Sequence, residues 1–482
     1  MNNSNKYIFL IFVSLIVFIS TIIFLIGVDI TFEISRHPIA SLFIKGICMI
    51  MLLIALILRN RDVLLYFFIL SFPFMRIMFV GITLLTAFAV ILGFLYRKEI
   101  IEFLRNKRNP YGAYFIVILF CLFLTTLISK YPLSALPDVV FFISLAGIYY
   151  VVSAFMNTKD RLKILIQLFL VVFGFCIVVS FIQLFFGVNS VKLFFGEYNN
   201  NVGINDLIKR VPSVFWEAQG AGQYFAVMVT LLLGIKNNFF KESKWLMYGL
   251  VFAGVLALLL TKSRIAIFVF IFSVFLTFFL FPSIKRILFL STICVGLLIL
   301  TLFPFDGSIM GRINNRFSQQ DIHKTADYRY LLWKESIPIA LHNPWGVGLG
   351  ADNLYRAAVK DNVFSTLHFN DFLQRKRGIQ FENSYLQILY SLGFLGLLAF
   401  LMILFRYFSL GTSLYGKNFP ADMKKLIFHQ LIAMTVWLSC IFTSPQFLEP
   451  QPMIIFMTLL ALMNSTRTIY LNESETMGKQ IL

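Results

Sequence analysis

Apolar runs of about 20 residues recur along this chain, and they limit its possible folds more than any other feature. An α-helix of that length crosses the roughly 30 Å hydrocarbon core of a bilayer. The chain is 59% hydrophobic and 13% charged, whereas an ordinary soluble domain is roughly 25% charged. We therefore predict an all-α polytopic membrane protein with about fourteen transmembrane helices. The composition excludes a soluble multidomain protein.

The net charge of +18 is carried mostly by short loops between the apolar runs. A strongly basic chain can indicate nucleic-acid binding, but this distribution is typical of the positive-inside pattern, which orients a membrane protein. We expect both termini in the cytoplasm and no nucleic-acid partner. The first run, 7–27, lacks a signal-peptide cleavage site, so we expect it to remain as an anchor.

The whole chain, 1–482, is expected to form one membrane domain with a single long extracytoplasmic loop at 303–384. Cytoplasmic segments are expected at 97–108, at 406–425 and from 464 onward. The expected spans are 7–27, 39–58, two within 63–94 broken near Pro73, 111–129, 134–155, 162–186, 221–235, 245–260, 265–281, 287–302, 385–405, 426–442 and 453–462.

Apart from those of the long loop, the main cations on the expected outer side, against the orientation rule, are Lys209, Arg210, Lys262 and Arg264. Lys262 and Arg264 sit in a very short connection between two spans, and Arg210 precedes another span. Guanidinium groups bind phosphate oxygens in a bidentate manner and keep their charge, so these residues are candidates for a diphosphate clamp. The alternative is that the long side chains extend to lipid headgroups, as they often do near helix ends.

The long loop contains a predicted helix at 325–340, which places Arg329 and Trp333 on one face because they are four residues apart. That face could bind a phosphate through the arginine and a sugar through the aromatic ring. The alternative is an amphipathic helix lying on the membrane surface with the tryptophan at headgroup depth.

Glu382 immediately precedes the expected span 385–405 and is a candidate general base that takes a proton from an attacking hydroxyl. A carboxylate in this position can also be only a partner of the helix dipole. Glu217 has a similar place before the span at 221–235. His342 and His368 are further titratable candidates, although a lone histidine more often has a structural role.

The glycine-rich stretch 346–351 formally matches the G-x-G-x-x-A dinucleotide fingerprint. No predicted strand precedes it and no βαβ unit surrounds it, so we reject a nucleotide site and predict tight turns. The five cysteines lie in apolar runs and are expected to pack between helices. No metal-ligand spacing is visible in the loops, so we expect metal-free chemistry and no cofactor.

Several of these stretches together resemble the O-antigen ligase and O-antigen polymerase superfamily of bacterial envelope enzymes. The matching stretches, in family order, are TKSR at 261–264, Arg329-x-x-x-Trp333, NPWGVGLG at 343–350 and ENSYLQILYSLGFLG at 382–396, with a weaker match in RVPSVF at 210–215.

The resemblance implies a metal-independent, inverting glycosyltransferase of the membrane-embedded GT-C type. Its donor would be a glycan on undecaprenyl diphosphate at the outer face of the bacterial inner membrane. In this sequence Arg264, Arg329 and Arg210 would hold the diphosphate, and Glu382 would be the base. Further substrate contacts are expected from Lys262, Trp333, Glu217 and His368.

Within the superfamily we favour a polymerase that joins lipid-linked repeat units. Family ligases commonly carry His-Asn where this chain has Glu382 and Asn383, and they typically have about a dozen spans. The alternative is transfer of the glycan to lipid A-core or to a protein. The expected partners are a lipid-linked donor and acceptor, the bilayer and a chain-length regulator.

A second class of function is a flippase for lipid-linked oligosaccharides. That function predicts charges deep within spans and repeated halves with broken helices. Lys45 is the main deep charge in the expected spans, and no paired halves are visible. A purely structural membrane anchor would leave the ordered outer arginines without an explanation.

Overall fold

Helices make up nearly all of the described structure, and several are long enough to cross a membrane. The computed structural model describes residues 61–74, 78–79, 82–105, 109–191, 210–235, 244–280, 329–330, 333–334, 337–338, 340–350, 353, 382–417, 419, 421–444 and 446–481. Five helices in these ranges have the length and hydropathy of a membrane span: Pro132–Phe155, Lys159–Phe186, Ala218–Ile235, Ser384–Tyr415 and Pro450–Asn472. Shorter apolar helices accompany them. The chain is therefore a polytopic membrane protein.

The first half of the described chain contains helices broken by one short hairpin. The elements are α3 (Arg61–Leu70), η1 (Phe72–Phe74), β1 (Met78–Phe79) paired antiparallel with β2 (Ile82–Thr83), α4 (Leu84–Leu95), α5 (Arg97–Arg105), α6 (Gly112–Ile128), α7 (Pro132–Phe155), α8 (Lys159–Phe186) and η2 (Val188–Val191). The expected break near Pro73 is confirmed, because α3 ends before it and α4 begins beyond the hairpin.

The second half supplies the centre of the bundle. Its elements are α10 (Ala218–Ile235), α11 (Lys244–Leu260), α12 (Arg264–Leu280), α18 (Ser384–Tyr415), α19 (Ala421–Ile441), η3 (Gln446–Leu448) and α20 (Pro450–Ile481). The expected spans 7–27, 39–58 and 287–302, and most of the loop 303–384, lie outside the described residues. Within that loop, the described residues from Arg329 to His342 are helical, as predicted.

Three segments expected on the cytoplasmic side are partly or wholly helical, because helices continue past the apolar runs. The segment 97–108 contains α5, 406–425 contains the end of α18 and the start of α19, and the tail from 464 belongs to α20. A helix satisfies its own backbone hydrogen bonds, so it does not have to stop where the apolar side chains stop. In α20, hydroxyl groups of Ser465 and Thr466 also donate to carbonyls four residues earlier.

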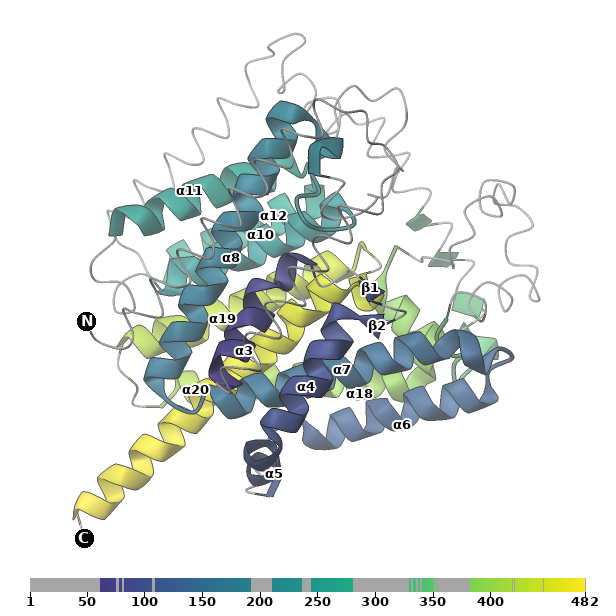
Figure 1. The fold of residues 1–482 in the computed structure, drawn as a ribbon, viewed down its shortest axis with the longest axis horizontal. Helices are drawn as coiled ribbons and strands as arrows, with labels where there is room; N and C mark the ends of the chain where they lie inside the picture. Colours follow the sequence, from purple (N-terminus) through teal and green to yellow (C-terminus); the bar gives the residue numbers. More distant parts are fainter. Residues whose placement is uncertain are drawn as a thin grey trace.

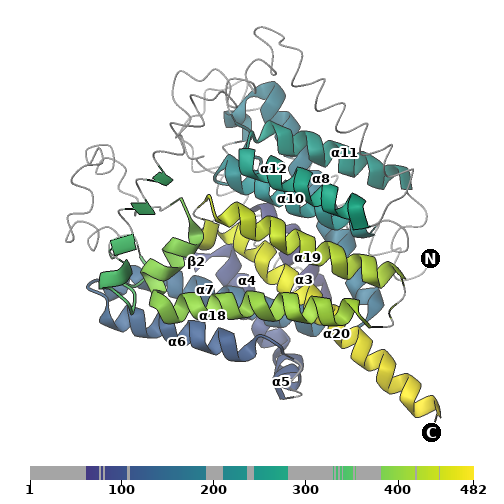
Figure 2. The same cartoon turned by 180° about the vertical axis from the view of Figure 1, so that it is seen from behind.

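The helices form two groups joined by α19 and α20. Helix α18 packs along α6, and α7 packs against both α4 and α20, while α10 packs along α19 and is flanked by α11 and α12 (Figure 1). From behind, α18, α19 and α20 lie side by side, and the C-terminal turns of α20 extend beyond the bundle (Figure 2).

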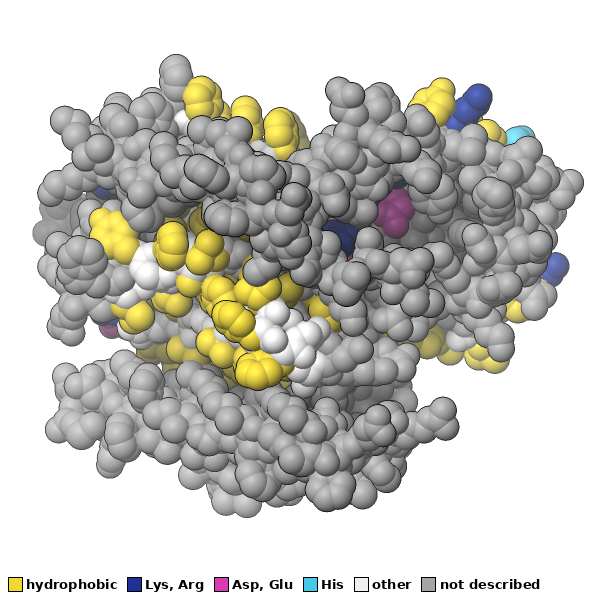
Figure 3. Space-filling model, turned by 90° about the horizontal axis from the view of Figure 1, so that it is seen from above, with side chains coloured by type: hydrophobic (Ala, Val, Ile, Leu, Met, Phe, Trp, Pro, Cys, Tyr) yellow, Lys and Arg dark blue, Asp and Glu magenta, His cyan; other side chains and the backbone are white. Residues whose placement is uncertain are grey.

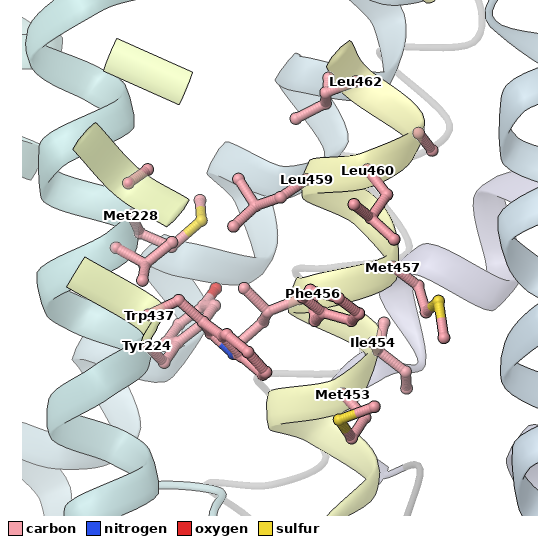
Figure 4. Packing of buried hydrophobic residues seen from close by; sticks show 14 of the residues in the cluster. Tyr224, Met228, Trp437, Met453, Ile454, Phe456, Met457, Leu459, Leu460 and Leu462 are labelled. Atoms are coloured by element: carbon pink, nitrogen blue, oxygen red, sulfur yellow. The ribbon is translucent and has the colours of Figure 1, made fainter. Parts of the chain in front are cut away.

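The core between α10, α19 and α20 is filled by aromatic, leucine and methionine side chains (Figure 4). The indole of Trp437 stacks on Phe456 with ring centroids 4.6 Å apart. Its Nε1 donates to the carbonyl of Pro452 at 3.0 Å, so the polar atom of this fully buried side chain is satisfied. This packing joins the last two helices to the centre of the bundle.

The outward faces of α6 and α18 are apolar. Their exposed side chains recur at the same helical spacing, namely Ile116, Phe120, Phe123 and Leu127 on α6 and Phe394, Leu398, Leu401 and Phe405 on α18. Stripes of this size rarely face water in a soluble protein. They therefore mark the faces that contact lipid.

Helix α18 is broken at Gly393, and the glycine-rich segment of the long loop fills the break. Gly393 has φ 70° and ψ −172°, a conformation that is essentially restricted to glycine. The amide of Phe394 donates to the carbonyl of Pro344 at 3.0 Å, and the amide of Val347 donates to the carbonyl of Tyr390 at 3.0 Å. The loop thus forms hydrogen bonds with backbone groups that the broken helix leaves unpaired.

The same segment is also tied to the N-terminus of α7. Gly346, Gly348 and Gly350 all have φ between 85° and 95°, so the prediction of tight turns is confirmed. The amide of Gly350 donates to Asp138 Oδ2 at 3.0 Å, and the side chain of Asn353 pairs with both backbone groups of Tyr131 at 2.9 and 3.0 Å. This part of the long loop is therefore built into the membrane bundle.

We predict that Gly393→Ala destabilises the folded protein, because a Cβ there would collide with the carbonyl oxygen of Pro344. The left-handed backbone alone would cost about 1–3 kcal/mol. The measurement is thermal unfolding of the purified protein in detergent. Gly249→Ala in α11 is the matched control, because a Cβ there meets nothing within 4 Å. An equal unfolding temperature in the two variants would contradict the role given to the break.

Candidate active site

The turns before α10, α12 and α18 meet at one end of the bundle. The amide of Val211 donates to the carbonyl of Leu260 at 3.2 Å, which places the segment before α10 against the α11–α12 turn. The Oγ of Ser384 donates to the carbonyl of Ser444 at 2.8 Å and accepts from the amide of Phe447 at 3.2 Å. These bonds fix the start of α18 against the connection between α19 and α20.

The expected cluster of cations lies at this end. Arg210 Nε donates to the carbonyl of Thr261 at 3.1 Å, so its guanidinium is held at the turn that carries Lys262 and Arg264. Lys262 is 6% exposed and has φ 52°, and Arg264 is the half-buried first residue of α12. The short connection predicted from the sequence is present, because α11 ends at Leu260.

Glu382 forms an ion pair with Arg329 across the long loop. Arg329 Nη2 lies 3.3 Å from Glu382 Oε2, and the two side chains are 20% and 27% exposed. The N-cap of α18 is Asn383, whose Oδ1 accepts from the amides of Tyr385 and Leu386. Asn383 therefore caps the helix, and the carboxylate of Glu382 is directed to the arginine.

The charges around Glu382 come from separate segments of the chain. Burial raises the pKa of Glu382 above its usual value, and Arg329 partly offsets this effect. The carboxylate of Glu217 raises the pKa of Glu382 further, whereas the guanidinium of Arg210 lowers it. A raised pKa makes the ionised carboxylate a better proton acceptor. Basic and acidic side chains are visible close together in the space-filling view from above (Figure 3).

Trp333 lies close to the same end of the bundle. Its ring packs edge-on against Phe442, with centroids 5.3 Å apart, and Phe442 also contacts Tyr385 of α18. Trp333 is half-buried. The face shared by Arg329 and Trp333 thus contacts the protein, through Glu382 and Phe442 respectively.

The sequence-predicted residues are only partly brought together. Arg210, Glu217, Arg329 and Glu382 interact electrostatically, and Lys262 and Arg264 lie on the turn that Arg210 contacts. His342 is exposed on the loop, and His368 lies outside the described residues. Among the described residues, no group of three His, Cys, Asp or Glu side chains could hold a metal ion. The expectation of metal-free chemistry stays a prediction.

Two buried glutamines that sequence reasoning missed hold the segment before α10. Gln183 of α8 exchanges two hydrogen bonds with the backbone of Ser213, at 2.8 and 3.0 Å. Gln451 of α20 donates to the carbonyls of Val214 and Pro73. For Gln183 the available signal was a polar residue inside an apolar run, because such a side chain needs a partner in lipid. The neighbouring sequence does not show which residue that partner is, because the partner comes from a distant segment.

Backbone strain is concentrated at the same place. The described residues other than glycine with positive φ are Ser213, Lys262 and Glu382. Left-handed backbone in such residues costs on the order of 1–3 kcal/mol and often marks binding or catalytic positions. All three precede helices of this site. This clustering is a second observation, separate from the charges, that supports a functional role for this end of the bundle.

Residues 248–401 match a family model described as O-antigen ligase. The matched stretch contains Arg264, Arg329 and Glu382, whereas Arg210 and Glu217 precede it. No curated protein matches the chain. The fold and this match together describe a polytopic membrane protein that carries a segment similar to the O-antigen ligase family. The resemblance of this stretch to the O-antigen polymerase and ligase superfamily is thereby confirmed.

We predict that Arg329 and Glu382 are energetically coupled in the folded protein. A double-mutant cycle of Arg329→Gln and Glu382→Gln should give a coupling energy on the order of 1 kcal/mol, read from unfolding in detergent. The ion pair of Arg161 and Asp62 is the matched control. It is longer, at 3.9 Å, and its side chains are 34% and 31% exposed, so its coupling should be smaller. If the effects of the Arg329 and Glu382 substitutions on the free energy of unfolding are additive, the predicted coupling is wrong.

Proposed function

We propose that this protein polymerises a bacterial surface polysaccharide by joining oligosaccharide repeat units linked to undecaprenyl diphosphate. The reaction is metal-independent, inverting glycosyl transfer at the outer face of the inner membrane, with both termini of the enzyme in the cytoplasm. The observation that carries the proposal is the 3.3 Å pair of Arg329 and Glu382 at the bundle end that also holds Arg210 and the 261–264 turn.

The arginines form the binding site for the donor diphosphate. Arg264 and Arg329 bind its oxygens and stabilise the negative charge that develops as undecaprenyl diphosphate leaves. The bond from Arg210 to the Thr261 carbonyl orients a third guanidinium toward the same turn. Lys262 adds positive potential from beneath the turn, and Trp333 offers an aromatic face to a sugar ring.

Glu382 is the general base. The hydroxyl of the acceptor sugar transfers its proton to the carboxylate, and the hydroxyl oxygen forms a bond to the anomeric carbon of the donor. The bond from that carbon to the diphosphate oxygen breaks, and its electron pair leaves with the carrier. Binding of the diphosphate draws Arg329 away from Glu382, which removes the main partner of the carboxylate and makes it more basic.

A polymerase is favoured over a ligase for two reasons. Glu382 stands where family ligases commonly carry histidine, and the sequence predicts about fourteen spans instead of about a dozen. The growing chain on its carrier is the donor, and a single lipid-linked unit is the acceptor. The alternative, transfer to lipid A-core or to a protein, is favoured by the similarity of residues 248–401 to the O-antigen ligase family.

The proposal predicts a change in the surface-glycan ladder of the source strain. Deletion of the protein should remove the long chains and retain a single repeat unit. Arg264→Ala and Arg329→Ala should fail to restore the ladder, because each removes a charge that stabilises the leaving group, worth about 10²–10³-fold in rate. The control is Arg97→Ala in α5, an exposed arginine that stacks on Phe94.

Membrane insertion of each variant is checked by membrane fractionation and immunoblotting. Normal long chains in both the Arg264 and Arg329 variants would contradict the proposal that these arginines bind the diphosphate. Loss of all surface glycan in the deletion strain, with carrier-linked polymer accumulating, would contradict the polymerase function and support a ligase function.

We further predict that Glu217→Gln moves the acidic limb of the pH–rate profile to lower pH. The base acts only when ionised, so activity falls as the pH drops through the pKa of Glu382. The charge of Glu217 raises that pKa, and its removal lowers it. The control is Glu102→Gln on the exposed side of α5. Glu382→Gln should reduce turnover about 10²–10⁴-fold; wild-type turnover there would assign the base to another residue.

A further inference from the structure

Gln446 is a buried side chain that the proposed mechanism does not use. It lies in η3, is 2% exposed, and its Oε1 has no hydrogen-bond partner among the described residues. The Oε1 of Gln219, in the first turn of α10, is also buried and has no hydrogen-bond partner among the described residues. An unsatisfied buried acceptor costs about 1–3 kcal/mol. A group that supplies the missing hydrogen bond would therefore be bound favourably.

Gln446 lies between the two segments that carry the acidic residues of the site. Ser384, two residues after Glu382, accepts a hydrogen bond from the amide of Phe447, the residue next to Gln446. On the other side, a Cβ added to Gly220 would be 3.0 Å from Gln446 Oε1. Gly220 is three residues after Glu217, so Gln446 lies between the starts of α18 and α10.

The chemistry of an amide oxygen identifies its ligand. It is a neutral acceptor, so it binds a hydroxyl donor and gives no attraction to a phosphate. The diphosphate has its own partners in the arginines on the α11–α12 turn and on the loop. The sugar whose hydroxyl reacts at Glu382 carries further hydroxyls within a few ångströms of the reacting oxygen. These hydroxyls need acceptors at the Glu382 side of the site.

Gln387, near the start of α18, also has a buried Oε1 without a hydrogen-bond partner among the described residues. Three other buried glutamines likewise have an unpartnered Oε1, but their side-chain NH2 groups are engaged between helices. Gln223 donates to the carbonyl of Trp437, Gln451 donates to Val214 and Pro73, and Gln430 contacts Thr466. Their amides tie helices of the bundle to one another. Gln446, in contrast, lies in the short turn between α19 and α20 beside the start of α18.

We propose that Gln446, together with Gln219, which precedes Gly220 in α10, forms a subsite that accepts hydrogen bonds from hydroxyl groups of the acceptor sugar next to Glu382. This inference rests on the polymerase function proposed above and adds the residues that recognise its acceptor. The subsite affects acceptor binding and leaves donor binding to the arginines. It also holds the acceptor ring so that only one hydroxyl reaches the carboxylate of Glu382.

The test uses full-length protein in detergent, carrier-linked polymer as donor, and carrier-linked single units extracted from a strain that lacks the protein as acceptor. Gln446→Leu should raise the KM for the single unit about fivefold to tenfold, as expected for one lost hydrogen bond. The KM for the polymer donor should not change. Gly220→Ala, which crowds Oε1, should raise the acceptor KM in the same direction.

Gln430→Leu is the matched control, because Gln430 is equally buried and its Oε1 also lacks a partner among the described residues, but it lies near the middle of α19. Its acceptor KM should equal that of the wild type. If Gln446→Leu fails to fold, Gln219→Leu and Gly220→Ala carry the test. An acceptor KM unchanged in these variants, or raised equally by Gln430→Leu, overturns the subsite. Absence of polymer with wild-type protein overturns the proposed function itself.

Discussion

The break in α18 at Gly393 is the constraint on which the site depends. In lipid, a broken helix must find partners for its freed backbone groups, and here the loop residues Pro344 and Val347 supply them. The short helix that carries Arg329 ends just before this anchored segment. Its C-terminal end is therefore fixed, which lets a loop residue meet Glu382 in a defined geometry. Asp138 and Asn353 extend the same anchorage to α7.

Polar side chains from the membrane helices position the rest of the site. Gln183 and Gln451 hold the backbone at Ser213 and Val214, and thereby set the places of Arg210 and Glu217 on either side. The strained backbone at Ser213, Lys262 and Glu382 is tolerated because buried bonds surround it. Buried hydrogen bonds thus position the site although much of it lies on connections between helices.

The site divides its chemistry among segments that are distant in sequence. Cations come from the segment before α10, the α11–α12 turn and the long loop, and carboxylates come from the starts of α10 and α18. The pair of Arg329 and Glu382 couples the two kinds of charge, so an anion bound by Arg329 changes the basicity of Glu382. In the proposed acceptor subsite, the neutral amides of Gln219 and Gln446 accept hydrogen bonds from the glycan.

The sequence by itself determined the membrane class, the positions of most described spans and the turns at Gly346, Gly348 and Gly350. Hydropathy and glycine conformation are local properties, so a linear reading captures them. The tertiary structure decided that α18 and α20 continue past Arg406 and Asn464, because buried packing and backbone bonds extend helices beyond their apolar runs. It also decided the pairing of Arg329 with Glu382, 53 residues apart, and the place of Gln446 between two helix starts. A charged or polar residue in the sequence shows that a partner is needed, but the partner is chosen only when distant segments pack together.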